Sequence, residues 1–214
     1  MQNKLLKNGG ILLLLGGFSF FIFEFITSIF WVSPTYSYLR NYVSDLGVPV
    51  ISSTNGYQFS SPMYGLMNFN FSLLALTILV GSIFFYFSLT IKRKRIYLIL
   101  VILTTLGLLF IANFPGYNWI GIAGHQIGAI LCLFSAAINA ILTSPAIGKQ
   151  YNKPIYTIVS STLGIISLIG IIITLSQVYP ASITGLIERM AIYPIILLQI
   201  TTGILMLKIS PKTK

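Results

Sequence analysis

Charge is what this sequence lacks most. Only 7% of its 214 residues are charged, and just three of these are acidic. A soluble domain carries about 25% charged residues, so this chain has too few to cover itself with a surface that water wets. Hydrophobic residues make up 56% of the chain and lie in long runs. The shortage of charge therefore excludes a soluble globular protein and predicts a helical integral membrane protein.

Soft metal ligands are almost absent as well. The chain has one cysteine, Cys132, and one histidine, His125. A single cysteine excludes an internal disulfide, and the two residues together are too few for a structural zinc site. We therefore expect no metal and no cofactor. The net charge is +10, but its basic residues stand in short groups between apolar runs, so we expect no nucleic-acid partner.

Six apolar runs are each close to the roughly 20 residues that cross a bilayer. They predict an all-α bundle of six transmembrane helices in a single domain, residues 1–214. The expected helices cover about 9–31, 64–91, 96–112, 122–143, 154–175 and 184–207, with a long loop over 32–63. The fourth helix is expected to end before Pro145, and Asn-Phe-Pro-Gly at 113–116 predicts a turn. The first run lacks a small-residue cleavage site, so we expect it to be retained.

Basic residues are distributed very unequally between the two sides of these helices. Eleven of the 13 lie on the side of the two termini, and Arg40 and Arg189 alone lie opposite. Because lysine and arginine concentrate in cytoplasmic loops, we expect both termini in the cytoplasm and the 32–63 loop outside. The sequence thus predicts a multi-pass protein of the cell membrane.

The remaining ionisable side chains gather near the outer membrane level, although four separate segments supply them. We expect His125, Asp45 and Glu188 to be catalytic, since histidine with carboxylates can do acid–base work. Two arginines suit a phosphate or carboxylate, and an intramembrane carboxylate is a functional hypothesis in itself. The expected binding residues complete the candidate site: Ser44, Arg40, Arg189 and Glu24.

Each of these residues also has a structural interpretation. Ser44–Gly47 has the composition of an Asx-type turn, with Asp45 bonded to its own backbone and Gly47 at positive φ. Glu188 suits a helix N-terminus. An Asp45–Arg189 pair or a Glu188–Arg40 pair would hold the loop over the bundle as a lid. Gly124-x-x-x-Gly128, which surrounds His125, is typical of close helix packing.

The order of these motifs resembles the DUF998 family of six-helix membrane proteins, whose function is unassigned. The motifs are Ser44-Asp45-Leu46-Gly47, Asn113-Phe114-Pro115-Gly116 followed by His125, and Gly185-Leu186-Ile187-Glu188-Arg189. The resemblance covers most of the chain. It implies that Ser44, Asp45, His125, Glu188 and Arg189 match the family's pattern, but it implies no reaction.

Two functions fit these observations. The first is a site that binds or acts on a membrane lipid or lipid-linked headgroup at the outer leaflet. The alternative is a non-enzymatic subunit or scaffold with a membrane-protein partner, in which the ionisable groups fasten the loop to the helix ends. A transporter is disfavoured, because the inner halves of the helices carry no acidic residue and no histidine. The sequence does not decide whether the protein is an enzyme.

Overall fold

The computed structural model describes residues 2–31, 35–49, 52–54, 57–59, 61–115 and 119–209, without the side chains of residues 2, 52–54, 57–59 and 119–121. It contains six long helices. They are α1 (Gln2–Ile29), α2 (Tyr64–Tyr86), α3 (Lys94–Asn113), α4 (Trp119–Tyr151), α5 (Pro154–Ser176) and α6 (Thr184–Lys208). All six are long and apolar enough to cross a membrane. The predicted all-α, six-helix class is confirmed, and the chain is a multi-pass membrane protein.

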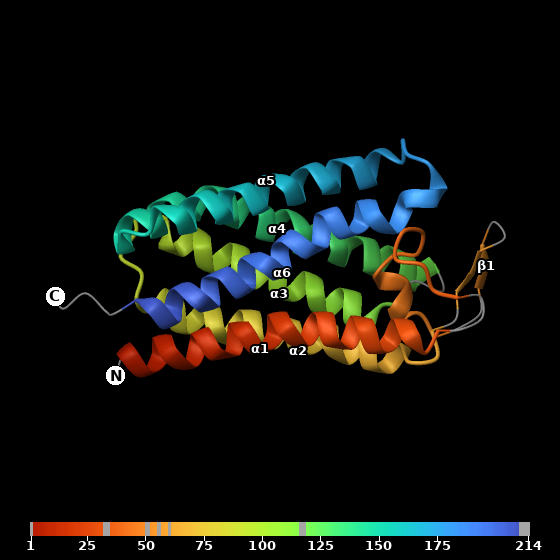
Figure 1. The fold of residues 1–214 in the computed structure, drawn as a ribbon, viewed down its shortest axis with the longest axis horizontal. Coiled ribbons are helices and arrows are strands. Elements are labelled where there is room, and N and C mark those ends of the chain that lie inside the picture. Colours follow the sequence, from red (N-terminus) through yellow and green to blue (C-terminus); the bar gives the residue numbers. More distant parts are fainter. Residues whose placement is uncertain are drawn as a thin grey trace.

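The helices form a ring in which each packs on its neighbours in sequence and α6 returns to α1 (Figure 1). A smaller contact between α4 and α6 crosses the ring. The start of α1 and the end of α6 lie together at one end of the bundle, which we name the terminal end. The opposite, loop end holds a short 3₁₀ helix, η1 (Ser44–Gly47), and two paired antiparallel strands, β1 (Ser52–Thr54) and β2 (Tyr57–Phe59).

Close approach of neighbouring helices in the ring depends on glycines that face one another. A Cβ on Gly10 of α1 would lie 2.9 Å from the Gly203 carbonyl oxygen of α6, and the reverse contact is also 2.9 Å. On the opposite side, a Cβ on Gly107 would lie 2.5 Å from the Gly128 carbonyl oxygen. Small residues let membrane helices pack backbone against backbone. The packing role expected of the motif that contains Gly128 is confirmed.

The fourth helix differs most from its expected boundaries. It does not end before Pro145 but continues to Tyr151. The helix ends just before Asn152, whose backbone has a left-handed φ of 54°. The Lys153 N–H then donates to the Gly148 carbonyl at 2.8 Å, the pattern of a Schellman cap. Tyr151 also donates to the Ser88 carbonyl at 2.9 Å, so contacts with the α2–α3 connection stabilise the extra turns.

The other boundaries differ by smaller amounts. The first helix begins at Gln2 rather than near residue 9, since Asn3, Lys4 and Lys7 continue its first turns. The second ends at Tyr86, before the expected residue 91. The expected turn at 113–116 is present at its start, where the helix ends at Asn113, whereas Gly116 lies outside the described residues. The third helix has 20 residues and spans like the others.

Candidate functional site

Arg189, near the start of α6, is the centre of the polar network at the loop end. Its Nη2 donates to Glu24 Oε1 at 3.0 Å and to the Tyr36 hydroxyl at 2.5 Å. Its Nε donates to the Tyr193 hydroxyl at 3.1 Å. Its Nη1 donates to three backbone carbonyls, those of Tyr38, Asn41 and Gly185, at 2.8 to 3.0 Å. All five guanidinium N–H groups therefore have acceptors within the protein.

Aromatic side chains enclose this arginine. Its Cζ atom lies 4.6 Å from the centre of the Tyr38 ring, 5.7 Å from that of Tyr36 and 5.9 Å from that of Tyr193. Burial raises the pKa of the Tyr36 hydroxyl far above its usual value, so this group stays neutral and donates onward to the Tyr42 carbonyl at 2.9 Å. Cation–π contact and hydrogen bonds together explain how a cation that is 6% exposed is held there.

Glu24 is the counter-ion. It lies on α1, is 1% exposed, and accepts hydrogen bonds from both Arg189 and Tyr193. This contact is the ion pair recorded among the described residues, and it differs from both pairs expected above. Asp45 is instead bonded within its own loop, and Arg40 is exposed. The loop is nevertheless held over the bundle, because Arg189 bonds to two of its backbone carbonyls.

Glu188 provides the second attachment of the loop. Its Oε2 accepts a short hydrogen bond from the Val43 backbone N–H, and its Oε1 accepts one from the Ser44 hydroxyl at 3.1 Å. Val43 precedes η1 and Ser44 is its first residue. Two adjacent residues of α6, Glu188 and Arg189, therefore bind the loop at two points. We name the group formed by Glu24, Tyr36, Glu188, Arg189 and Tyr193 the loop clamp.

The turn at Ser44–Gly47 is not the expected Asx turn. Asp45 Oδ2 accepts from the backbone N–H of Tyr42, three residues earlier, at 2.8 Å. Gly47 has no left-handed φ. A Cβ there would lie 2.4 Å from Asn68 Oδ1, so the Asn68 side chain would have to move to accommodate it. Burial, and then the nearby charge of Glu188, raise the pKa of the Asp45 carboxyl well above its usual value of 3.8.

Beneath this turn lies a cavity of about 40 Å³, which we name the loop-end cavity. Its walls are apolar apart from three polar side chains, His125, Ser44 and Glu188, which come from α4, η1 and α6. The imidazole of His125 has a hydrogen bond to the backbone of Phe114. Its Nδ1 atom is buried and has no partner in the part of the chain that the structure describes. The apolar lining includes Phe20, Phe71, Leu74, Leu108, Ile111 and Ile192.

The seven candidate residues thus do not form a single site. Ser44, His125 and Glu188 line the loop-end cavity, and Glu24 and Arg189 belong to the loop clamp together with Glu188. Asp45 lies in the turn between them, close enough to Glu188 for their charges to interact. Arg40 is exposed and stands apart from both. Because its five donors are already occupied, Arg189 is not free to bind a phosphate in this conformation.

Three tyrosines contact Arg189 and were not predicted as site residues: Tyr36 and Tyr193 of the loop clamp, and Tyr38 beside it. Tyr193 lies four residues after Arg189, a spacing that places both on one face of α6, so the sequence did contain this signal. Tyr36 and Tyr38 come from the loop, where their sequence fits headgroup contact equally well. His125 and Glu188 are far apart in sequence, and only the closed ring brings them to one cavity.

Comparison with known proteins gives one match. Residues 14–205 match the family described as "Protein of unknown function (DUF998)", which covers most of the chain. No curated protein and no solved structure matches. The resemblance seen in the order of the motifs is therefore confirmed over residues 14–205: this chain belongs to the DUF998 family.

Proposed function

We propose that this protein binds one end of a lipid or lipid-linked molecule in the loop-end cavity. The observation that carries the proposal is the composition of that cavity, which is apolar apart from the side chains of His125, Ser44 and Glu188. Binding sites for small molecules are typically apolar pockets with a few convergent polar groups. An amphiphile matches this pattern, with its polar atoms against the three side chains and its apolar part against the walls.

The size of the cavity limits what it holds. A single water needs roughly 10–15 Å³ on the same measure, so about 40 Å³ takes the end of an amphiphile and not a whole lipid. The rest of such a molecule would remain in the bilayer. His125 is the group with spare bonding capacity, because its buried Nδ1 has no partner among the described residues. Acid–base chemistry on a bound headgroup would therefore begin at this atom.

Native mass spectrometry of the protein, extracted gently from its own membrane, tests the proposal. Two variants alter the cavity differently: His125→Ala removes the free imidazole, and Ala129→Leu fills the space from the same helix. Gln126→Ala is the matched control, because Gln126 is adjacent to His125 but exposed. We expect a defined lipid-type molecule on the wild type and on Gln126→Ala, and its loss from both cavity variants. The same bound lipids in all four proteins would refute the proposal.

The loop clamp supports the second candidate, a non-enzymatic subunit of a larger membrane assembly. Glu24, Arg189 and the tyrosines satisfy one another, which is what a purely structural network requires. The clamp would then present a fixed loop surface to a membrane-protein partner. In the same experiment, a stoichiometric protein partner without a defined lipid would favour this function over the first.

A further inference from the structure

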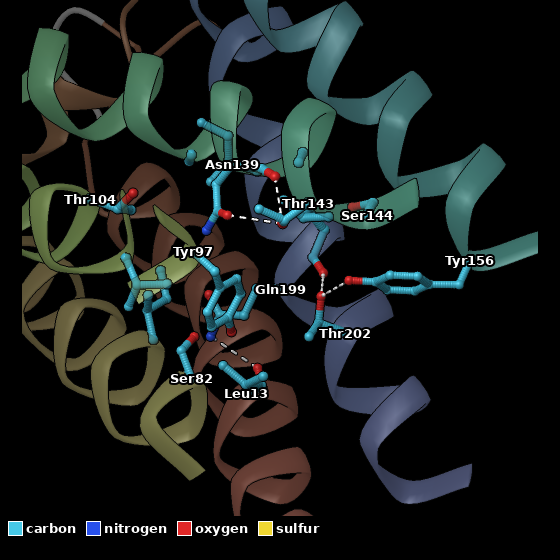
Figure 2. Close-up of a pocket in the computed structure, with 16 residues that line it drawn as sticks. Leu13, Ser82, Tyr97, Thr104, Asn139, Thr143, Ser144, Tyr156, Gln199 and Thr202 are labelled. Atoms are coloured by element: carbon cyan, nitrogen blue, oxygen red, sulfur yellow. Dashed lines mark hydrogen bonds between the residues drawn. The ribbon is translucent and has the colours of Figure 1, made fainter. Parts of the chain in front are cut away.

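A second cavity, of about 60 Å³, lies between the loop-end cavity and the terminal end, and every one of the six helices contributes to its wall. We name it the polar cavity. Its lining contains no charged residue but many hydrogen-bonding side chains (Figure 2). These are Ser82, Tyr97, Thr104, Asn139, Thr143, Ser144, Tyr156, Gln199 and Thr202. So many polar groups around one space inside an apolar bundle require an explanation beyond helix packing.

Gln199 on α6 has an unsatisfied acceptor at this cavity. Its side-chain nitrogen donates to the Leu13 carbonyl at 3.0 Å and to the Thr77 hydroxyl at 3.3 Å. The carbonyl of Leu13 can only accept, so it fixes which end of the amide faces α1. The other end, Oε1, is buried and has no partner among the described residues, although Gln199 is only 5% exposed. A buried acceptor without a hydrogen bond destabilises the fold, so Gln199 Oε1 favours binding of a molecule that donates a hydrogen bond to it.

Asn139 supplies a complementary group from α4. The Thr143 hydroxyl donates to the Asn139 backbone carbonyl at 2.7 Å and also lies 3.0 Å from Asn139 Oδ1. The amide nitrogen of Asn139 carries two protons, so it keeps donor capacity beside this contact. In Figure 2 the side chains of Asn139 and Gln199 extend into the space between the helices from α4 and α6. Nearby, the Tyr156 and Thr202 hydroxyls are bonded to each other at 3.2 Å. Among the described residues, the cavity therefore offers an unpaired acceptor on Gln199 and donor capacity on Asn139.

Because no charged residue lines the polar cavity, a neutral ligand fits it better than an ion. An ion at membrane depth is costly unless an opposite charge is close, and none of the residues around this cavity supplies one. A neutral molecule that both donates and accepts hydrogen bonds meets no such cost. On the measure where one water needs roughly 10–15 Å³, about 60 Å³ accommodates a molecule of the size of glycerol or urea.

We propose that the polar cavity binds a small uncharged polyol or amide, with Gln199 Oε1 accepting from the ligand and Asn139 donating to it. This site is separate from the loop-end cavity. Ile78 and Ile195 line both spaces and form an apolar partition between them. The proposal therefore does not depend on lipid binding at the loop end.

Solute protection of an introduced cysteine tests the inference in the intact protein. The reporter is Thr143→Cys, which lines the cavity, in a Cys132→Ala background that removes the native thiol. The thiol reagent is methyl methanethiosulfonate, which is small and uncharged. Its rate of reaction with the introduced cysteine is measured in nanodiscs in the presence of glycerol or urea. Trehalose at equal osmolality is the control solute, because it is too large to enter the cavity. If Thr143→Cys does not fold, Ser144→Cys is the second reporter at the same cavity.

We expect glycerol or urea to slow modification at least threefold in a saturable way, while trehalose does not. Gln199→Leu should abolish this protection, because it removes the free acceptor. Thr201→Val is the matched control on α6: its hydroxyl bonds to its own helix at Leu197, outside the cavity lining, and protection should persist. The inference is overturned if the cysteine does not react, or if neither solute protects more than trehalose, which would leave only water in the cavity. It is also overturned if protection survives Gln199→Leu, because the free acceptor would then not hold the solute.

Discussion

Replacing Arg189 by glutamine should be among the most damaging single changes at the loop end. The variant leaves Glu24, which is 1% exposed, without its counter-ion, and it frees the carbonyls of Tyr38 and Asn41. Removing one partner of a buried ion pair costs about 3–5 kcal/mol. Since 1.4 kcal/mol is a factor of ten, the unfolding equilibrium should shift by roughly two to three orders of magnitude. Steric trapping in bicelles measures this free energy of unfolding.

Arg40 provides the matched control, because it is an arginine at the same end of the bundle that is exposed. Arg40→Gln should change the free energy of unfolding by less than about 0.5 kcal/mol. Hydrogen exchange of the amides in residues 36–47 gives a second readout, and it should speed up only in Arg189→Gln. If the two variants have equal stability, or if exchange in the loop is unchanged by Arg189→Gln, the clamp does not hold the loop.

Exchanging the two charges should not restore stability. In Glu24→Arg/Arg189→Glu, the new carboxylate would face the carbonyls of Tyr38, Asn41 and Gly185, which accept hydrogen bonds and cannot donate them. The free energy of unfolding of this double variant should therefore stay close to that of the worse single variant. Recovery to the wild-type value would show that only the ion pair matters.

Two further predictions concern the turn and the ring. The raised pKa of Asp45 means that the folded state favours its protonated form, so this contribution to stability is full below pH 3.8 and is lost as the pH rises through the folded pKa. Over that window, the free energy of unfolding should fall less steeply in Asp45→Asn than in the wild type. Equal slopes in the two proteins would contradict this prediction. Gly107→Ala should lower the free energy of unfolding by about 1–3 kcal/mol, because its Cβ would lie 2.4 Å from the Cys132 backbone nitrogen. Gly65→Ala is the control: a Cβ there meets no atom within 4 Å, so this variant should lower the free energy of unfolding far less in the same assay.

Hydrophobic length was sufficient to predict the bundle, because spanning a bilayer needs about 20 apolar residues whatever the neighbouring helices do. It was not sufficient to place the end of α4. Pro145 removes one backbone donor, which is a local signal for a helix end. The bonds of Tyr151 to the α2–α3 connection and the cap at Asn152 outweigh it, and the first of these depends on residues some sixty positions away.

The membrane level of the ionisable residues was predictable, but their pairing was not. Helix ends and apolar runs place Glu24, Glu188 and Arg189 near one end of the bundle. The direction of each side chain depends on the closed ring and on the path of the loop. The polar cavity was hidden for a similar reason: Asn139 and Gln199 each look like ordinary packing residues in their own helix, and only the ring assembles them around one space.

The three carboxyl groups at the loop end make protonation of one of them part of the closed structure. Three carboxylates, Glu24, Asp45 and Glu188, lie near one buried arginine, and the ion pair with Glu24 already uses its charge. Two further buried carboxylates whose charges interact cannot both ionise without a large cost. One of them must therefore hold a proton for the loop to stay closed. Deprotonation would strain the turn at Ser44–Gly47, which forms the roof of the loop-end cavity. Raising the pH through the folded pKa of Asp45 and the variant Arg189→Gln should therefore open the same segment.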